Sequence, residues 1–176
     1  YADPGIVISE YQNKLDLTTQ NPIETISLRI SNKSPKAVNS VLVLVPSDRK
    51  VIGASAEDAY GQKLEIKELA QTVNVLVDGK SMLEFRQFEI TPQQPISPEY
   101  DLKIPNLRFV YNSFYVFKPK STDFFDSQKV LVQIYKTSAS PYKVESSTTE
   151  VLYGDNRRVE NYNGRELAPF TATSTK

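Results

Sequence analysis

The chain contains no cysteine and no histidine among its 176 residues. Without cysteine, no disulfide, thiol nucleophile or cysteine-ligated metal site can form. Without histidine, the Ser-His-Asp and Cys-His catalytic arrangements and every histidine-ligated zinc or iron site are excluded. The six glycines form no phosphate-cradling motif. We therefore expect no catalytic residues, no metal ion and no cofactor.

The sequence also lacks an excess of either charge and a long apolar run. It has 21 basic and 21 acidic residues, which give a formal net charge of zero, and no basic run exceeds two residues. A nucleic-acid partner is therefore not expected. No apolar run approaches the ~20 residues that span a bilayer. Because the chain begins without methionine, we expect it to be a mature or excised soluble fragment.

What is present indicates a globular, strand-rich domain. Ten tyrosines and eight phenylalanines accompany an apolar content of 39%, enough for one sizeable core. Ile26, Leu28 and Ile30 alternate with polar residues, which predicts a strand with one buried face. The apolar run 41–45 predicts a strand covered on both faces. Asp78-Gly79 between the apolar runs 73–77 and 82–85 predicts a hairpin.

Proline and glycine positions complete the fold prediction. Pro105 interrupts an otherwise strand-like stretch, 102–117, and should mark an edge position or a bulge. The segment Ser55–Leu69 is the only candidate helix, and Gly61 in its middle weakens it. Strands at intervals of about ten residues with Pro- or Gly-marked turns are typical of an antiparallel β-sandwich. We predict an all-β fold of this type with at most one short helix, as a single domain over residues 1–176.

Two readings of the aromatic segment after Leu107 remain open. The stretch Phe109–Phe117 carries bulky side chains at both odd and even positions, as does a central strand with core on both sides. Alternatively, part of this region contacts a partner, because exposed aromatic side chains concentrate at interfaces. The candidate partner surface comprises Tyr115, Phe117, Phe124 and Phe125.

Two further motifs carry residue types that could take part in chemistry. The carboxylates Glu57-Asp58, Glu65 and Glu68 could suggest paired acids, as in glycosidases. Interleaved lysines instead indicate a solvated charged face. Asn32-Lys33-Ser34 is the only N-glycosylation acceptor triplet. Because Pro35 follows it directly, we treat Asn32 as a weak site.

The order and spacing of several short motifs can be compared with those of known protein families. Near the start, Leu15-Asp16-Leu17-Thr18-Thr19 precedes the alternating strand that ends at Asn32. Later come an aromatic strand with Pro119, a short apolar strand at 130–132, and a turn that precedes a Thr-rich strand ending at Val151. The turn residues are Ser140, Pro141 and Tyr142, and the closing residues are Val159, Glu160 and Tyr162. This arrangement resembles the N-terminal luminal region of the ribophorin I family, the alpha subunit of the eukaryotic oligosaccharyltransferase.

The resemblance covers most of the chain, although residues 47–100 follow only the general plan. It implies a non-catalytic subunit of the endoplasmic-reticulum complex that transfers an oligosaccharide to asparagine, with catalysis in another subunit. It also implies that this chain is the first of two luminal β-sandwich domains of a membrane-anchored parent. The implied partners are other subunits of the complex, with the nascent polypeptide as a further candidate. Tyr135-Lys136-Thr137-Ser138 depart from the family pattern and indicate a diverged member.

Two alternative functions, neither of which involves oligosaccharide transfer, remain open. Tyr111, Tyr115 and the Phe-rich segment could build a carbohydrate-binding β-sandwich, in which rings stack on the sugar. A cell-surface adhesin-type sandwich with no role in glycosylation would show the same composition.

Overall fold

The computed structural model of the chain describes residues 4–77, 81–116, 118–119, 130–131, 140–154 and 170–175. Its strands are β1 (Ile6–Asp16), β2 (Ile23–Asn32), β3 (Val41–Pro46), β4 (Val51–Glu57), β5 (Lys63–Val77), β6 (Ser81–Thr91), β7 (Asp101–Tyr111), β8 (Lys118–Pro119), β9 (Val130–Leu131), β10 (Lys143–Val144), β11 (Ser147–Gly154) and β12 (Phe170–Thr175). Among the described residues the one helix is α1 (Ser113–Val116), a single turn of four residues. The prediction of an all-β fold with at most one short helix is confirmed.

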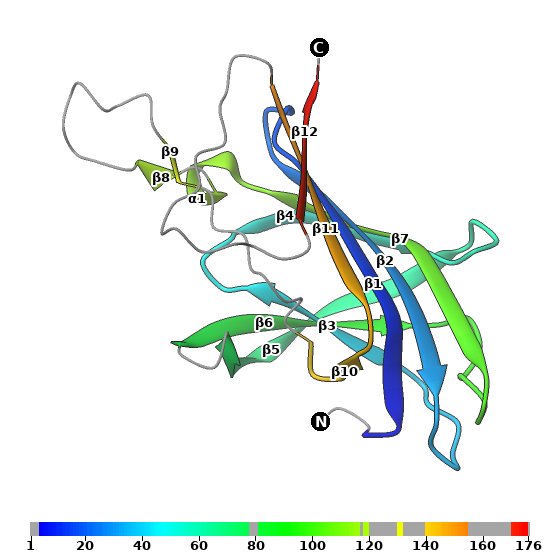
Figure 1. Cartoon of the computed structure of the whole chain (residues 1–176). Helices are drawn as coiled ribbons and strands as arrows, with labels where there is room; N and C mark the ends of the chain where they lie inside the picture. Colours follow the sequence, from blue (N-terminus) through cyan, green and yellow to red (C-terminus); the bar gives the residue numbers. More distant parts are fainter. Residues whose placement is uncertain are drawn as a thin grey trace.

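Ten of the described strands form one curled sheet (Figure 1). Its order is β12-β11-β1-β2-β7-β4-β5-β6-β3, and β10 pairs with β1 beside this path. Strands β5, β6 and β3 form a layer that crosses the layer of β1, β2, β7 and β11. The layers are connected where β4 pairs with β5 over two residue pairs, Ala56↔Leu64 and Glu57↔Lys63.

The predicted antiparallel sandwich needs correction, because the sheet is mixed and curls on itself. Strands β10 and β11 both pair with β1 in parallel, and β12 pairs in parallel with β11. Parallel neighbours require a crossover rather than a tight hairpin. Strands from the C-terminal part of the chain are therefore added to β1 from a distance in sequence, which local turn signals do not reveal.

The alternation in β2 is confirmed, and a bulge explains the less regular pattern of β1. Ile26, Leu28 and Ile30 are all buried. In β1 the pairing with β2 shifts between Ile8 and Glu10, so one extra residue interrupts the strand. Because side chains alternate with period two, an extra residue reverses which positions face inward. The buried residues accordingly change from even positions (Ile6, Ile8) to odd ones (Tyr11, Leu15).

Strand β7 confirms the prediction for Pro105 and corrects the one for the aromatic strand. The pairing of β7 with β2 shifts next to Pro105, where β7 carries one more residue than β2. The strand ends at Tyr111 and α1 follows, so residues 102–117 are not one strand. Phe109 and Tyr111 are fully buried, whereas Arg108 is exposed and Val110 is half-buried. This part of the segment therefore has one core face and not two.

The predicted helix over Ser55–Leu69 is wrong, because this segment forms the end of β4 and the first part of β5. The connecting turn explains the difference. Asp58 Oδ1 accepts hydrogen bonds from the backbone N–H groups of Tyr60 and Gln62, both at 2.9 Å. Gly61 has a φ of 76°, which glycine adopts without the cost that a Cβ imposes. The glycine that weakens the helix thus supports a tight turn.

The hairpin flanking Asp78-Gly79 is confirmed in its pairing. Strands β5 and β6 are antiparallel, and Leu76 faces Met82 close to their connection. The connecting residues 78–80 lie outside the described residues. All six residues of β3 are buried, as the continuous apolar run predicted. Its side chains contribute to the main core and, through Leu44, to a second cluster with Phe85.

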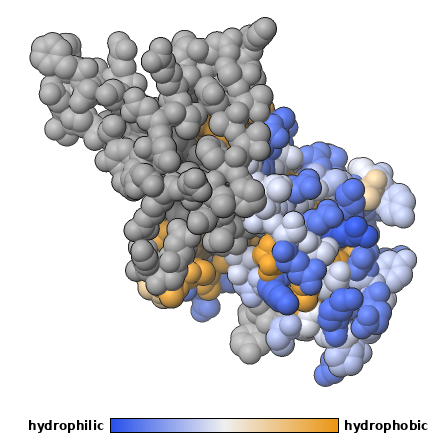
Figure 2. Space-filling view, viewed as in Figure 1, coloured by the Kyte–Doolittle hydropathy of each residue, from blue (hydrophilic) through white to orange (hydrophobic). Residues whose placement is uncertain are grey.

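The described part of the surface is mostly hydrophilic on the face shown in Figure 2. Among the described residues, five large hydrophobic side chains are exposed: Ile52, Tyr60, Leu76, Met82 and Tyr100. Of these, Leu76 and Met82 are cross-strand neighbours at the end of the β5–β6 hairpin. In the described part of the chain, no helix is both long and apolar enough to cross a membrane.

Candidate functional site

The predicted turn Ser140-Pro141-Tyr142 is present and positions Tyr142 against the second layer. The backbone N–H of Tyr142 donates to Ser140 Oγ (3.1 Å), which closes the turn locally. The Tyr142 ring is buried, and its Oη accepts a hydrogen bond from the backbone N–H of Leu42 (2.9 Å). Leu42 lies on β3, the strand at one end of the sheet order, whereas Tyr142 directly precedes β10, which pairs with β1. This hydrogen bond therefore connects two parts of the sheet that are far apart in the strand order.

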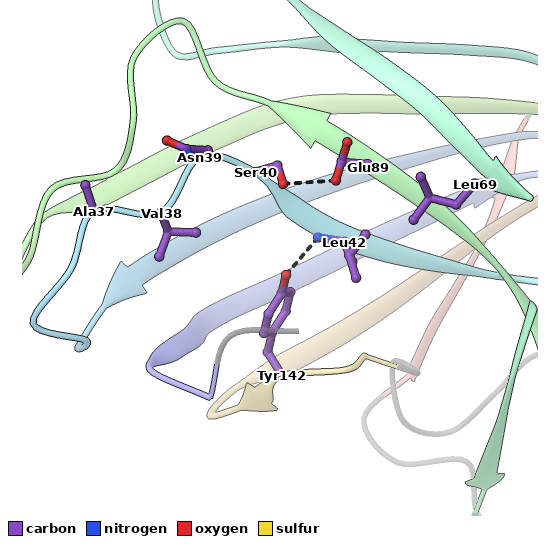
Figure 3. Close-up of a pocket in the computed structure, with 8 residues that line it drawn as sticks. All are labelled: Ala37, Val38, Asn39, Ser40, Leu42, Leu69, Glu89 and Tyr142. Atoms are coloured by element: carbon purple, nitrogen blue, oxygen red, sulfur yellow. Dashed lines mark hydrogen bonds between the residues drawn. The ribbon is translucent and has the colours of Figure 1, made fainter. Parts of the chain in front are cut away.

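Next to this contact lies a half-open hollow of about 300 Å³, which we call the β3–β6 groove (Figure 3). Its lining residues are Ala37, Val38, Asn39, Ser40, Leu42, Leu69, Glu89 and Tyr142. Four of them, at 37, 38, 42 and 69, contribute aliphatic walls. The one charged side chain in the lining is Glu89, whose Oε2 accepts a hydrogen bond from Ser40 Oγ (3.1 Å).

A second polar cluster is buried in the core around Glu24. Tyr111 Oη donates to Glu24 Oε1 (2.6 Å), and Asn13 Nδ2 donates to Glu24 Oε2 (3.0 Å). Arg49 Nη1 lies 3.9 Å from Oε2, and the guanidinium carbon lies 5.4 Å from the centre of the Tyr111 ring. Thr149 Oγ1 on β11 donates to Asn13 Oδ1 (2.8 Å). The cluster therefore joins strands β1, β2, β7 and β11.

The environment of this cluster raises the pKa of two tyrosines. Burial is the main cause for Tyr111, whose pKa lies well above 10.0; the Glu24 carboxylate raises it further and Arg49 opposes the shift. The pKa of Tyr11 is raised by the same three causes in the same order. Both carboxylate oxygens of Glu24 have donors within the cluster. We therefore interpret this buried network as one that stabilises the fold and does not bind a ligand. The alternation of β2 could have revealed Glu24, since it shares the even positions of Ile26 and Leu28.

The acceptor residue Asn32 is fully buried. Its Nδ2 donates to the carbonyls of Lys36 and Ile96, each at 2.8 Å, and its Oδ1 accepts from the backbone N–H of Ser34 (2.9 Å). Its backbone also bonds to Glu99 and Tyr100. A glycan on Nδ2 would replace a hydrogen that these bonds use, so we expect the folded protein to carry none.

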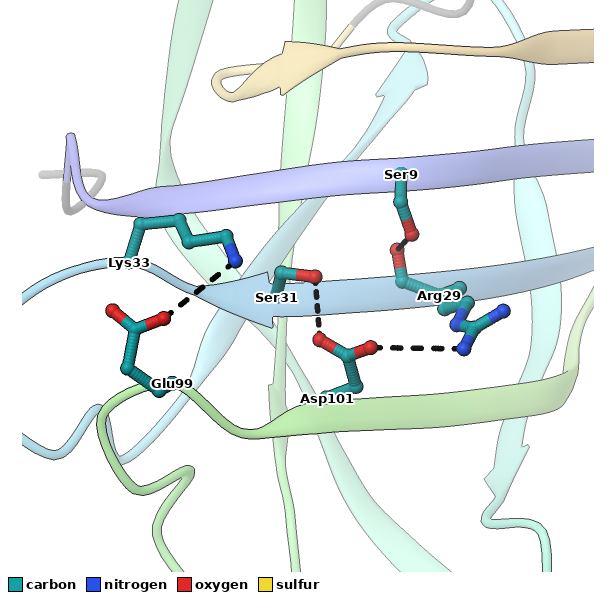
Figure 4. A network of polar contacts seen from close by, with 6 residues as sticks. All are labelled: Ser9, Arg29, Ser31, Lys33, Glu99 and Asp101. Carbon is teal, nitrogen blue, oxygen red and sulfur yellow. Dashed lines mark hydrogen bonds and ion pairs between the residues drawn. The ribbon is translucent and has the colours of Figure 1, made fainter.

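Strands β1, β2 and β7 are also connected by polar contacts, which involve exposed charged side chains and the buried Ser31 (Figure 4). Ser31 Oγ donates to Asp101 Oδ1 (2.6 Å), and Arg29 lies 3.7 Å from the same carboxylate. Lys33 and Glu99 form a further pair at 3.7 Å. Such exposed pairs stabilise a fold by only about 0–1 kcal/mol each. Glu65 and Glu68 on β5 are likewise exposed, which agrees with a solvated charged face.

Several predicted residues cannot be placed. Phe117, Phe124, Phe125, Val159, Glu160 and Tyr162 lie outside the described residues, and for Tyr115 only the backbone, within α1, is described. The proposed partner surface at these aromatic residues stays a prediction. Among the described residues, no group of three or more acidic side chains is arranged to hold a metal ion.

Comparison with known proteins gives one extensive match. A sequence profile of the ribophorin I family matches residues 6–175, nearly the whole chain. The search of curated proteins found no match. Among solved structures, two-domain M1 zinc metallopeptidase bound to L-tryptophan and M1 zinc metallopeptidase from Deinococcus radiodurans both align with a TM-score of 0.40 and 14% identity. The alignments cover 62% of this chain but only 21% and 20% of those proteins, respectively. Likeness at this level carries no functional argument.

The fold and the profile together define the class: a nearly all-β chain with one curled mixed sheet and a family match over nearly its whole length. The chain belongs to the ribophorin I family. The resemblance inferred from the motif order is confirmed by a match of this length.

Proposed function

We propose that this chain is part of a non-catalytic structural and interaction subunit of the oligosaccharyltransferase complex, which supports protein N-glycosylation. The observation that carries the proposal is the family match over residues 6–175. The sequence agrees with it to this extent: a chain without histidine or cysteine cannot form the Ser-His-Asp or Cys-His catalytic arrangements.

The setting of the subunit forms part of the same proposal. Residues 1–176 form a single domain in the endoplasmic-reticulum lumen, the first of two in a parent protein anchored in the membrane. Its partners are other subunits of the complex, and the nascent polypeptide is a further candidate. Bond formation takes place on another subunit, and this chain needs no cofactor.

Co-purification from cells tests the proposal. The full parent protein, carrying an affinity tag, should retain the other oligosaccharyltransferase subunits after mild detergent extraction. Lowering its abundance should reduce glycan occupancy on reporter glycoproteins. A parent protein that purifies without these subunits, and whose depletion leaves occupancy unchanged, would refute the assignment. A tagged membrane protein of the same compartment provides the control.

The carbohydrate-binding alternative receives little support from the described residues. Tyr111, one of its two tyrosines, is fully buried and bonded to Glu24, so its ring cannot stack on a sugar. Titration with glycans, followed by NMR of the aromatic resonances, would test the remaining rings. The adhesin-type alternative would be favoured by a parent protein with a membrane span directly after Lys176 and no second β domain.

A further inference from the structure

The β3–β6 groove combines an acidic group with aliphatic walls at one end of the sheet (Figure 3). Glu89 is half-buried on β6. Ser40 Oγ donates to Oε2, and among the described residues no donor reaches Oε1. A partly desolvated carboxylate with one unused oxygen is stabilised most by a positive charge.

Among the described residues, no basic side chain lies within ion-pair distance of Glu89. None of the ion pairs formed there involves Glu89. Lys67 is the cross-strand neighbour of Glu89 on β5, but its side chain is exposed and makes no ion pair with it. In this structure the groove therefore presents a carboxylate that forms no ion pair with a described residue, and Lys67 stays exposed on the neighbouring strand.

The walls indicate which kind of cation fits. Leu42 and Leu69 line the groove with aliphatic surface, as do Ala37 and Val38. Basic side chains pair a charged end with an apolar stem that packs along such surface. A sugar ring would instead favour an exposed aromatic face. The one ring in the lining, Tyr142, is buried and its hydroxyl accepts the N–H of Leu42.

We propose that the β3–β6 groove binds a lysine or arginine side chain of a partner polypeptide, with the ammonium or guanidinium group at Glu89 and the stem against Leu42 and Leu69. Charge complementarity selects this occupant over an apolar or acidic one. This proposal does not depend on the complex to which the chain belongs. Peptide titration tests the groove and co-purification tests the proposed function, so the failure of one can be told apart from the failure of the other.

NMR titration of the whole 176-residue chain with acetyl-Ala-Lys-Ala-amide tests the site. The expected result is a set of shifts confined to residues 37–42, 69, 89 and 142, with millimolar affinity that weakens as salt is added. The matched peptide with norleucine in place of lysine should produce no comparable shifts. Chitobiose serves as the sugar control and should leave these residues unmoved.

Two variants make the test specific. Glu89→Gln keeps the size of the side chain and removes its charge, so it should weaken the lysine peptide about tenfold or more. Glu84→Gln changes an exposed glutamate on the same strand and should bind as the unchanged protein does. The spectral dispersion of each variant reports whether it is folded. Equal affinity of Glu89→Gln and the unchanged protein, shifts elsewhere in the spectrum, or equal shifts with norleucine or chitobiose would each overturn the proposal.

Discussion

Replacing Tyr111 with phenylalanine tests the buried cluster around Glu24. The Tyr111 hydroxyl donates to Glu24 Oε1 at 2.6 Å, a length typical of an O–H donor on a carboxylate. Among the described residues, Tyr111 is the only donor to that oxygen, since Asn13 and Arg49 both approach Oε2. The ring itself stays in place, so packing changes little.

The expected loss follows from the burial of both partners. Tyr111 is 0% exposed and Glu24 is 7% exposed, so water cannot replace the lost donor. Hydrogen bonds to charged groups contribute about 1.5–3 kcal/mol. We expect Tyr111→Phe to lower the free energy of unfolding by about 2 kcal/mol.

Urea unfolding followed by far-ultraviolet circular dichroism measures the change. Tyr100→Phe is the matched control, because Tyr100 is 67% exposed and its loss should stay within about 0.5 kcal/mol. A cycle with Glu24→Gln should show coupling of about 1 kcal/mol or more between the two positions. If Tyr111→Phe is no more destabilising than Tyr100→Phe, the cluster does not contribute as argued.

The remaining predictions concern pH, modification and packing. Because the pKa values of Tyr11 and Tyr111 are raised in the folded state, their contribution is complete below pH ~10 and declines above it, by up to about 1.4 kcal/mol per pH unit for each; unfolding at pH 9–11 should show this slope halved in Tyr111→Phe, and an unchanged slope would contradict it. The folded protein, expressed through the secretory pathway, should show no glycan on Asn32 by mass spectrometry, and Asn32→Ala should cost about 3 kcal/mol through its lost buried hydrogen bonds. A Cβ at Gly5 would overlap with the Cβ of Ser34, in the segment that follows β2, so Gly5→Ala should destabilise by about 2 kcal/mol in thermal melts, and a neutral result would show that this segment adapts. Tyr142→Phe leaves a backbone N–H of β3 without its acceptor and should cost about 1 kcal/mol, measured by urea unfolding; an increase in stability would be inconsistent with this contact.

Sequence patterns predict the local structure correctly where it depends on residues that are neighbours along the chain. The strand at Ile26–Ile30, the hairpin pairing around Asp78-Gly79 and the bulge at Pro105 were all predicted correctly. Each depends on side-chain alternation or on the backbone restrictions of one residue. The predicted helix at Ser55–Leu69 is wrong because Gly61 does more than weaken a helix: its positive φ allows the turn between β4 and β5.

The site could be predicted only in part. The turn at Tyr142 was identified from its motif, but its partner, the N–H of Leu42, is 100 residues away in sequence. No local signal connects two such positions. The burial of Asn32 was likewise hidden, since the acceptor triplet describes three residues and its partners at Ile96 and Tyr100 come from a later segment.

Alternation and turn residues are enough to predict that this protein is built from strands, and the order of its motifs indicates a family that a profile over nearly the whole chain confirms. The order of those strands, the parallel pairing of β11 with β1, and the position of Glu89 and Tyr142 on one groove become visible only in the folded chain. The physical reason is that alternation and turn chemistry act between near neighbours. Strand order and the formation of a groove instead depend on which apolar faces, distant in sequence, pack against one another and are removed from water.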